Sequence, residues 1–143
     1  MEFTYPADLW FECNGCGLCC GDTQRKTRHI LLLSSEAERI AMQTNQAVAD
    51  FAVARDARDA KDLYIYEMKK TDGKCVFLKG NRCVIYSSRP LVCICYPFEL
   101  RFDARKKVYS FDFTVECPTI GKGKQLNKTY FQKLFVAAQE RLC

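Results

Sequence analysis

The segment Cys13-Asn14-Gly15-Cys16-Gly17-Leu18-Cys19-Cys20 is the strongest signal in the sequence, because it places four thiols within eight residues. With two residues between successive cysteines, the backbone can turn tightly around a compact metal centre and bring each thiolate onto it. The two glycines allow positive φ angles, so backbone N–H groups can point inward at sulfur and stabilise its buried negative charge. The segment therefore predicts a metal-binding loop.

Cys19 and Cys20 are adjacent, which is unusual for two ligands of one metal ion. Side chains of neighbouring residues diverge in most backbone conformations. The pair therefore fits two separate sites, or one ligand with one supporting residue, better than a single four-coordinate site. The cysteine pattern alone leaves both interpretations open.

The whole chain contains ten cysteines in 143 residues. Its N-terminus lacks the basic start and apolar segment of a secretory signal, so we expect a cytoplasmic protein. Thiols are kept reduced in the cytoplasm, which favours metal binding over disulfides, although a disulfide framework stays open as an alternative. No apolar run approaches the ~20 residues of a membrane span, and we expect no membrane association.

The net charge of +5 is unevenly distributed along the chain. Residues 1–100 carry 13 basic and 13 acidic side chains, whereas residues 101–143 carry 9 basic and 4 acidic ones. We interpret the basic third as a solvated face, with an acidic protein partner as the alternative. Nucleic acid is not expected as a partner, because the basic residues neither cluster nor alternate with aromatic ones.

The apolar pattern predicts an α+β fold in a single domain over residues 1–143, because strands and helices mix without a βαβ rhythm. Ser35 and Glu38 match the capping box of a helix that runs to about Gln43. Further helices are expected at about residues 46–61, in a short segment after Pro90 and at about 127–142. Expected strands cover residues 28–33, 63–68, 75–78, 83–86, 98–102 and 108–113, with turns at Asp72-Gly73 and Gly80-Asn81.

The later cysteines lie in segments that, with the first one, resemble a known family. From Cys13 to about Gly123 the chain resembles the cysteine-cluster proteins of the YkgJ type, described as zinc- or iron-chelating domains. The motifs that carry the resemblance are Cys13-x-x-Cys16-Gly17-x-Cys19-Cys20, Cys75-Val76-Phe77-Leu78, Cys83-Val84-Ile85-Tyr86-Ser87-Ser88-Arg89-Pro90-Leu91-Val92-Cys93 and Cys117-Pro118.

The resemblance implies a set of metal ligands, which are Cys13, Cys16, Cys19, Cys20, Cys75, Cys83, Cys93 and Cys117. These eight thiols suit two four-ligand sites or one site with reserves. The chain departs from the family where an arginine usually follows the seventh cysteine, since Ile94 and an extra Cys95 stand there. We interpret Cys95 as an added ligand or a small buried apolar residue. Cys143 lies outside the resemblance.

Ligand type does not decide the metal, because thiolates suit zinc and iron–sulfur clusters alike. One dense run with scattered distant cysteines favours a [4Fe–4S] cluster, with zinc as the alternative. We expect Cys13, Cys16 and Cys19 or Cys20 to anchor the cluster, with a fourth ligand from the distant set. Its expected role is electron transfer or support of a protein-modifying enzyme partner. A zinc-stabilised interaction module and a metal chaperone or sensor are the alternatives.

The resemblance also extends to flagellin lysine methylases, in which the same cluster is joined to further sequence. These 143 residues contain no G-x-G-x-x-G motif for a methyl donor, so we do not carry that activity over. Arg89 is expected either to neutralise an anionic cluster or to form a structural ion pair. His29 is expected at a strand edge, and Phe3, Tyr5, Trp10 and Phe11 are expected to cover the metal site.

Overall fold

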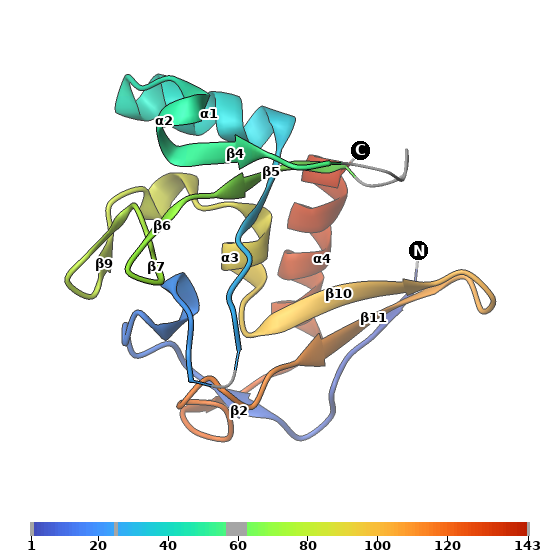
Figure 1. Ribbon diagram of the computed structural model, residues 1–143. Helices are drawn as coiled ribbons and strands as arrows, with labels where there is room; N and C mark the ends of the chain where they lie inside the picture. The colour runs from blue at the N-terminus through green and yellow to red at the C-terminus, as the bar shows by residue number, and fades with distance from the viewer. Residues whose placement is uncertain (1, 25, 57–62, 143) are drawn as a thin grey trace. The chain divides into compact units, whose positions relative to one another are not determined.

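The protein has a mixed α+β structure, as the sequence predicts (Figure 1). The computed structural model describes residues 2–24, 26–56 and 63–142. These residues form two compact units, one comprising Gly15–Cys93 and the other Met1–Asn14 with Ile94–Cys143. We refer to them as the cysteine-rich unit and the hairpin–helix unit. The expectation of a single domain stays a prediction.

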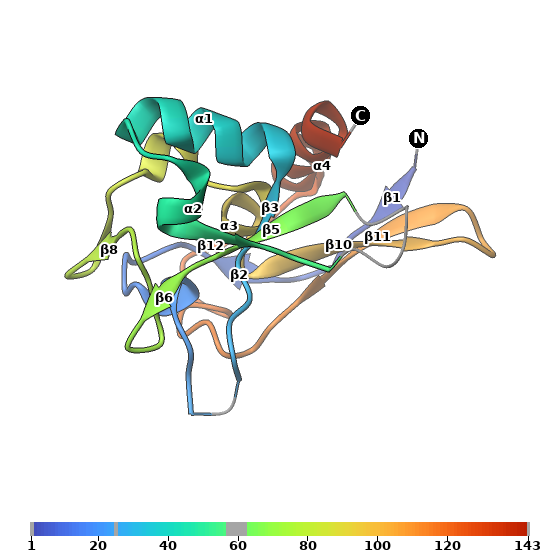
Figure 2. The same cartoon turned by 45° about the horizontal axis from the view of Figure 1, so that its top comes forward.

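The cysteine-rich unit is built on a three-stranded antiparallel sheet with the order β3-β5-β4. Its strands are β3 (Leu31–Leu33), β4 (Ala52–Ala54) and β5 (Tyr64–Met68). Helices α1 (Ser34–Thr44) and α2 (Val48–Phe51) lie beside β4 and β5 in both views (Figures 1 and 2). Apolar side chains from all five elements form one buried cluster, which supplies the hydrophobic stabilisation of this unit.

Helix α1 begins differently from the prediction. The predicted capping box between Ser35 and Glu38 is wrong, because the N-cap is Leu33, two residues before Ser35, and Glu36 makes the capping contact. One carboxylate oxygen of Glu36 accepts a hydrogen bond from the Leu33 amide at 3.0 Å. The other accepts one from the Leu91 amide at 2.6 Å, and only 2% of the residue is exposed. Glu36 therefore joins the starts of two helices.

The helix expected over residues 46–61 is also wrong. Helix α2 ends at Phe51, and the chain continues directly into β4. Ala52 pairs with Met68 and Ala54 with Tyr66, so β5 captures this segment as a strand. Phe51 and Ala52 are buried there, and their burial outweighs the local helical pattern. Residues 57–62 of the expected helix lie outside the described residues.

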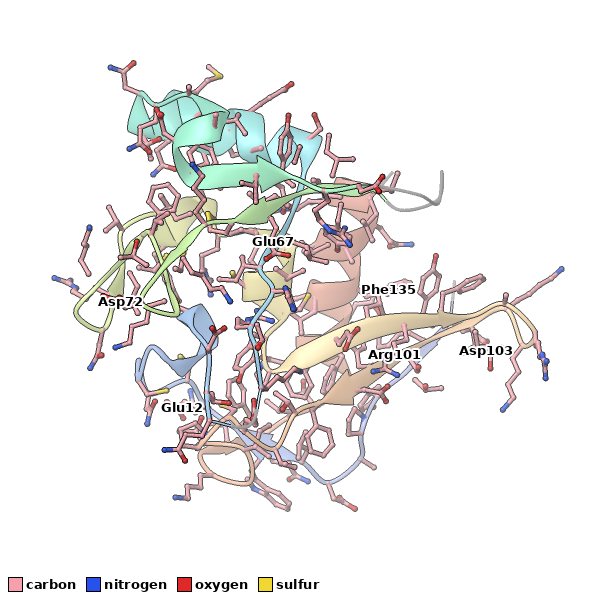
Figure 3. All side chains as sticks on the ribbon, in the orientation of Figure 1. Glu12, Glu67, Asp72, Arg101, Asp103 and Phe135 are labelled. Atoms are coloured by element: carbon pink, nitrogen blue, oxygen red, sulfur yellow. The ribbon has the colours of Figure 1, made fainter. Side chains whose placement is uncertain are left out.

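Two small hairpins follow the sheet. The first pairs β6 (Lys70–Thr71) with β7 (Lys74–Cys75), and Asp72 lies at its turn (Figure 3). The second pairs β8 (Leu78–Lys79) with β9 (Arg82–Cys83). Both turns stand where the sequence predicts them, but the strands are only two residues long. A 3-10 turn at Tyr86–Ser88 and helix α3 (Leu91–Cys95) complete the path.

The hairpin–helix unit combines a long hairpin with an amphipathic helix. Strands β10 (Phe98–Asp103) and β11 (Val108–Phe113) pair along their whole length, and their turn projects away from α4 (Lys128–Leu142) in Figure 1. Strand β1 (Phe3–Thr4) adds to β11 in parallel. The predictions of this hairpin and of the last helix are confirmed.

The core of this unit is aromatic. Rings of α4 pack against rings of the hairpin, as in Phe131–Phe98 at 5.0 Å and Phe131–Phe111 at 5.3 Å. Phe3 and Tyr5, which were expected to cover the metal site, belong to this core instead: Phe3 packs on Phe135, and Tyr5 stacks on Phe131. Both rings are half-buried, and their contacts with the other rings stabilise this core.

A second strand pair closes this unit. Strand β2 (Trp10–Phe11) runs antiparallel to β12 (Lys124–Gln125). Gly123 approaches Glu12 so closely that an added Cβ would stand 2.5 Å from the Glu12 Cβ, so only glycine fits there. Among the residues that the structure describes, no helix has the length and apolar character to cross a membrane.

Candidate metal centre

Five thiols of the cysteine-rich unit gather at its apolar cluster. Cys75 is part of the buried cluster, and Cys20, Cys83 and Cys93 pack against it. Cys19 stands beside Cys20, with 3.9 Å between the two sulfurs. The five sulfurs lie within electrostatic range of one another, because the charge of Cys19 raises the pKa of Cys20, Cys75, Cys83 and Cys93. The fold thus unites thiols that lie up to 74 residues apart in sequence.

The turn Leu18–Cys20 is held beside β7 by its own backbone. The predicted positive φ angles of Gly15 and Gly17 are confirmed, at 72° and 77°. The Cys20 amide donates to the Gly17 carbonyl at 3.1 Å, which closes the turn. Gly21 then forms a bridge with Lys74, and an added Cβ at Gly21 would stand 2.9 Å from the Gly73 carbonyl oxygen. Glycine at position 21 therefore allows the cysteine turn to approach the residue before Cys75.

Cys75 and Cys83 each start a turn whose amides point at their sulfur. The backbone N–H groups of Phe77 and Leu78 bond to the Cys75 sulfur and oppose the rise of its pKa. The Ile85 amide does the same for Cys83. Amides directed at sulfur stabilise a thiolate and are a common feature of thiolate–metal loops. The sequence carries a signal for both turns that the motif analysis missed, since Cys-Val-Phe-Leu is followed eight residues later by Cys-Val-Ile-Tyr.

Arg28 is a basic residue of this centre that the cysteine motifs did not indicate. Its Nε donates to the Cys19 carbonyl at 3.0 Å and its guanidinium reaches the Val92 carbonyl at 3.5 Å, next to Cys93. Its charge lowers the pKa of both Cys19 and Cys93. A basic residue is missing after Cys93, where Ile94 stands. The fold supplies one from a distant segment, which no motif in the sequence revealed.

The adjacent cysteines differ in protonation. A hydrogen bond from the Cys20 thiol lowers the pKa of Cys19 to about 6, and the charge of Arg28 lowers it further against the effect of burial. The same hydrogen bond, with burial, raises the pKa of Cys20. At neutral pH Cys19 is therefore a thiolate and Cys20 its donor. Of the two predicted alternatives, this arrangement favours one ligand with one supporting residue, and the ligand assignment itself stays a prediction.

The other three thiols are protonated at neutral pH. Burial raises the pKa of Cys75 and Cys83, and it raises the pKa of Cys93 to about 12. All nine described cysteines are thiols and not disulfides. Within the described residues, no three Cys, His, Asp or Glu side chains already stand in the geometry of a metal site. The soft donor set fits a thiophilic metal, and binding must draw the sulfurs together, so it also stabilises the fold.

The remaining predicted site residues fall in different places. Cys16 is half-buried in the cysteine-rich unit, whereas Cys13 and Cys117 belong to the hairpin–helix unit. Arg89 stacks on the Tyr86 ring at 3.9 Å, and its charge lowers the pKa of Cys19 and Cys83. Arg89 therefore stands within electrostatic range of the centre. His29 instead pairs with Glu67: its Nδ1 stands 3.1 Å from Oε1 of Glu67.

Metal affinity is expected to depend steeply on pH. Cys75, Cys83 and Cys93 must each release a proton to become ligands, whereas Cys19 is already ionised above about pH 6. Each released proton changes the affinity about tenfold per pH unit, so three protons give about a thousandfold weaker Zn²⁺ binding at pH 7 than at pH 8. Competition with a chromophoric chelator at the two pH values measures this ratio. A ratio near one would contradict the protonated state of these thiols.

The fold and the thiols together define a small α+β protein suited to chelate a thiophilic metal. Residues 12–118 match the family described as "CxxCxxCC: Putative zinc- or iron-chelating domain". The chain belongs to this family, and the resemblance drawn from its motifs is confirmed. Membership supports metal binding through the cysteines.

One relative has been found among curated proteins. The "Uncharacterized protein MJ0661" of Methanocaldococcus jannaschii is 31% identical over 110 residues, which make up 76% of this chain and 56% of that protein. The chain thus spans little more than half the length of this relative. No solved structure matches the chain.

Proposed function

We propose that the cysteine-rich unit binds a [4Fe–4S] cluster through Cys19, Cys75, Cys83 and Cys93. The observation that carries the proposal is the convergence of Cys75, Cys83 and Cys93 on one apolar cluster. Cys20 packs on the same cluster, and the Cys19 sulfur lies 3.9 Å from the Cys20 sulfur. A [4Fe–4S] cluster takes four thiolates, which is the number that these four residues supply. Cys16 belongs to the same unit and serves as a reserve thiol.

The surroundings of these thiols suit a centre with a net negative charge. The amides of Phe77, Leu78 and Ile85 point at sulfur, and Arg28 and Arg89 add two positive charges within electrostatic range. Hydrogen bonds to sulfur and nearby charge are the means by which proteins set the potential of a cluster. The apolar cluster against which these thiols pack limits access of water.

The cluster supplies one-electron redox chemistry, and the protein uses it to pass electrons to a partner protein or to support a protein-modifying enzyme. The proposal places the protein in the cytoplasm, where thiols stay reduced and available to metal. The charge of the C-terminal third supports an acidic surface on the partner. A pull-down with the cluster-loaded protein would identify the partner.

The deciding experiment is a metal analysis of the full chain purified without oxygen. We expect about four iron and four acid-labile sulfide per chain, with a brown colour and broad absorbance near ~400 nm. A colourless protein with stoichiometric zinc would contradict the proposal of a [4Fe–4S] cluster. The two Cys-Val turns favour zinc as the second candidate, because amides directed at sulfur also surround structural zinc. The protein would then be a zinc-stabilised interaction module.

Removal of the Arg28 charge is expected to lower the reduction potential. Positive charge stabilises the reduced state of a cluster, which is the more negative one. Each tenfold change in the equilibrium constant between the reduced and oxidised states shifts the potential by about 60 mV. Arg28→Gln should therefore shift the potential down by tens of millivolts, whereas Arg28→Lys should retain most of it. Arg39→Gln, on the exposed side of α1, is the matched control. Equal shifts for Arg28→Gln and Arg39→Gln, measured by redox titration, would contradict this role.

A further inference from the structure

Three cysteines outside the centre described above lie in the hairpin–helix unit. They are Cys13, Cys95 and Cys117, and they come from three separate segments of the chain. Cys95 and Cys117 are 5% and 8% exposed, while Cys13 lies at the surface. Cys95 has no counterpart among the family motifs.

Backbone hydrogen bonds bring the segments of Cys13 and Cys117 together. Cys117 opens a turn in which its carbonyl accepts from the Ile120 amide at 3.2 Å. The next residue, Gly121, donates to the Trp10 carbonyl at 2.7 Å, and Trp10 belongs to the strand that leads to Cys13. The pairing of β2 with β12 continues this contact, so the two segments run side by side.

The ring of Phe98 links the Cys95 segment to the same place. Phe98 follows Cys95 by three residues, and its ring packs edge-on against Phe11 at 5.9 Å. Phe11 in turn precedes Cys13 by two residues. The Thr114 amide bonds to the Pro97 carbonyl at 3.0 Å, which ties the chain leading to Cys117 to the residue before Phe98. All three thiol-bearing segments therefore converge around Phe98.

Tyr130 of α4 lies near all three thiols. Its ring packs on Phe98 at 6.0 Å. Burial raises the pKa of Tyr130 to about 12, and the charges of Cys95, Cys13 and Cys117 add to the rise. One phenol thus lies within electrostatic range of all three sulfurs, which agrees with the convergence of their backbones.

We propose that Cys13, Cys95 and Cys117 form a second metal site, which binds a thiophilic divalent cation of the Zn²⁺ class. Three thiolates with a fourth position for an exogenous ligand are an established zinc arrangement. The fourth position opens to solvent, because Cys13 is exposed. The site is independent of the iron–sulfur proposal, since no sulfur is shared between the two centres.

The three thiols do not stand in coordinating geometry, and the same is true of every other group of Cys, His, Asp or Glu side chains among the described residues. Cys95 and Cys117 are buried and Cys13 is exposed, so we expect metal binding to move the Cys13 segment most. The alternative is that Cys95 and Cys117 only fill space as small apolar side chains. If the three thiols bind metal, Zn²⁺ should slow the reaction of Cys13 with an alkylating agent. If Cys95 and Cys117 only fill space, Zn²⁺ should leave this reaction unchanged.

The experiment uses the full chain with its first centre intact, stripped of loosely bound metal and then given Zn²⁺ alone. Differential alkylation with iodoacetamide and mass spectrometry follows each cysteine, and metal analysis counts zinc. We expect one added Zn²⁺ per chain and at least about tenfold slower alkylation of Cys13. Unchanged alkylation of Cys13, or no added zinc, would overturn the second site.

Two variants make the test specific. Cys95→Ala should lose the added zinc and the protection of Cys13, while the metal content of the first centre stays unchanged. Cys13→Ala alters only an exposed side chain, so it covers the case in which the buried substitution prevents folding. It should lose the same zinc equivalent. Retention of that zinc in both variants, or loss of the first centre's metal in Cys13→Ala, would overturn the assignment. Cys143→Ser is the control and should behave as the unaltered chain.

Discussion

Cys19→Ser is expected to abolish metal loading of the cysteine-rich unit. Cys19 is the thiol whose pKa is lowered, to about 6, and its charge reaches the four other sulfurs. A serine hydroxyl cannot replace a thiolate for a soft metal. Because binding of the metal draws separate segments together, its loss should also lower the soluble yield and the thermal midpoint by several degrees. Metal counts and a melting curve measure both effects.

The matched control for this variant is Cys143→Ser. Cys143 lies outside the segments that carry the family motifs, so metal content and melting temperature should stay unchanged. Cys20→Ser separates the two adjacent residues, since Cys20 acts as a donor to Cys19 and a serine hydroxyl can still donate. We expect Cys20→Ser to retain much of its metal. Full metal content in Cys19→Ser would rule out Cys19 as a ligand.

Glu36→Ala is expected to destabilise the protein by about 3 to 5 kcal/mol. The carboxylate accepts hydrogen bonds from the Leu33 and Leu91 amides, and its removal leaves two buried donors without a partner. Hydrogen bonds to a charged group contribute about 1.5 to 3 kcal/mol each, and buried orphan donors add to the cost. Chemical denaturation gives the free energy of unfolding directly.

Two further variants define the cause of this loss. Glu36→Gln keeps one acceptor oxygen, so we expect it to lose less stability than Glu36→Ala. Glu38→Ala changes an exposed carboxylate on the same helix and should stay within about 0.5 kcal/mol of the unaltered chain. Leu91 opens the helix that carries Cys93, so Glu36→Ala should also weaken metal binding. Equal stability of Glu36→Ala and Glu38→Ala would refute the capping role of Glu36.

The elements that the sequence predicted correctly are those with a strong local pattern. The β10–β11 hairpin alternates apolar and polar residues over its length, and α4 repeats its apolar residues at helical spacing. The segment after Gln46 shows the limit of this approach. Its alanines and alternating charges favour a helix locally, but pairing with β5 at Met68 and Tyr66 decides its structure. A contact with a strand that comes ten or more residues later leaves no trace in a local pattern.

The candidate site shows the same contrast between local sequence patterns and contacts that are distant in the sequence. The family resemblance supplied the eight candidate thiols, and their role as ligands stays a prediction. The resemblance could not divide them between centres, since Cys13 and Cys16 are three residues apart yet belong to different units. Arg28 was missed for a related reason. Its role comes from a carbonyl that lies 64 residues away, at Val92.

The different protonation states of Cys19 and Cys20 also determine which cysteine of the metal-free protein is oxidised first. A thiolate with a lowered pKa reacts first with peroxide, forming a sulfenic acid that a neighbouring thiol can convert to a disulfide. Protonated, buried sulfurs such as that of Cys93 react far more slowly. Oxidative damage to the empty protein should therefore begin at one sulfur, Cys19, and a filled centre would shield that sulfur. We therefore expect metal-free chains to lose metal-binding capacity through oxidation of Cys19 unless metal binds first.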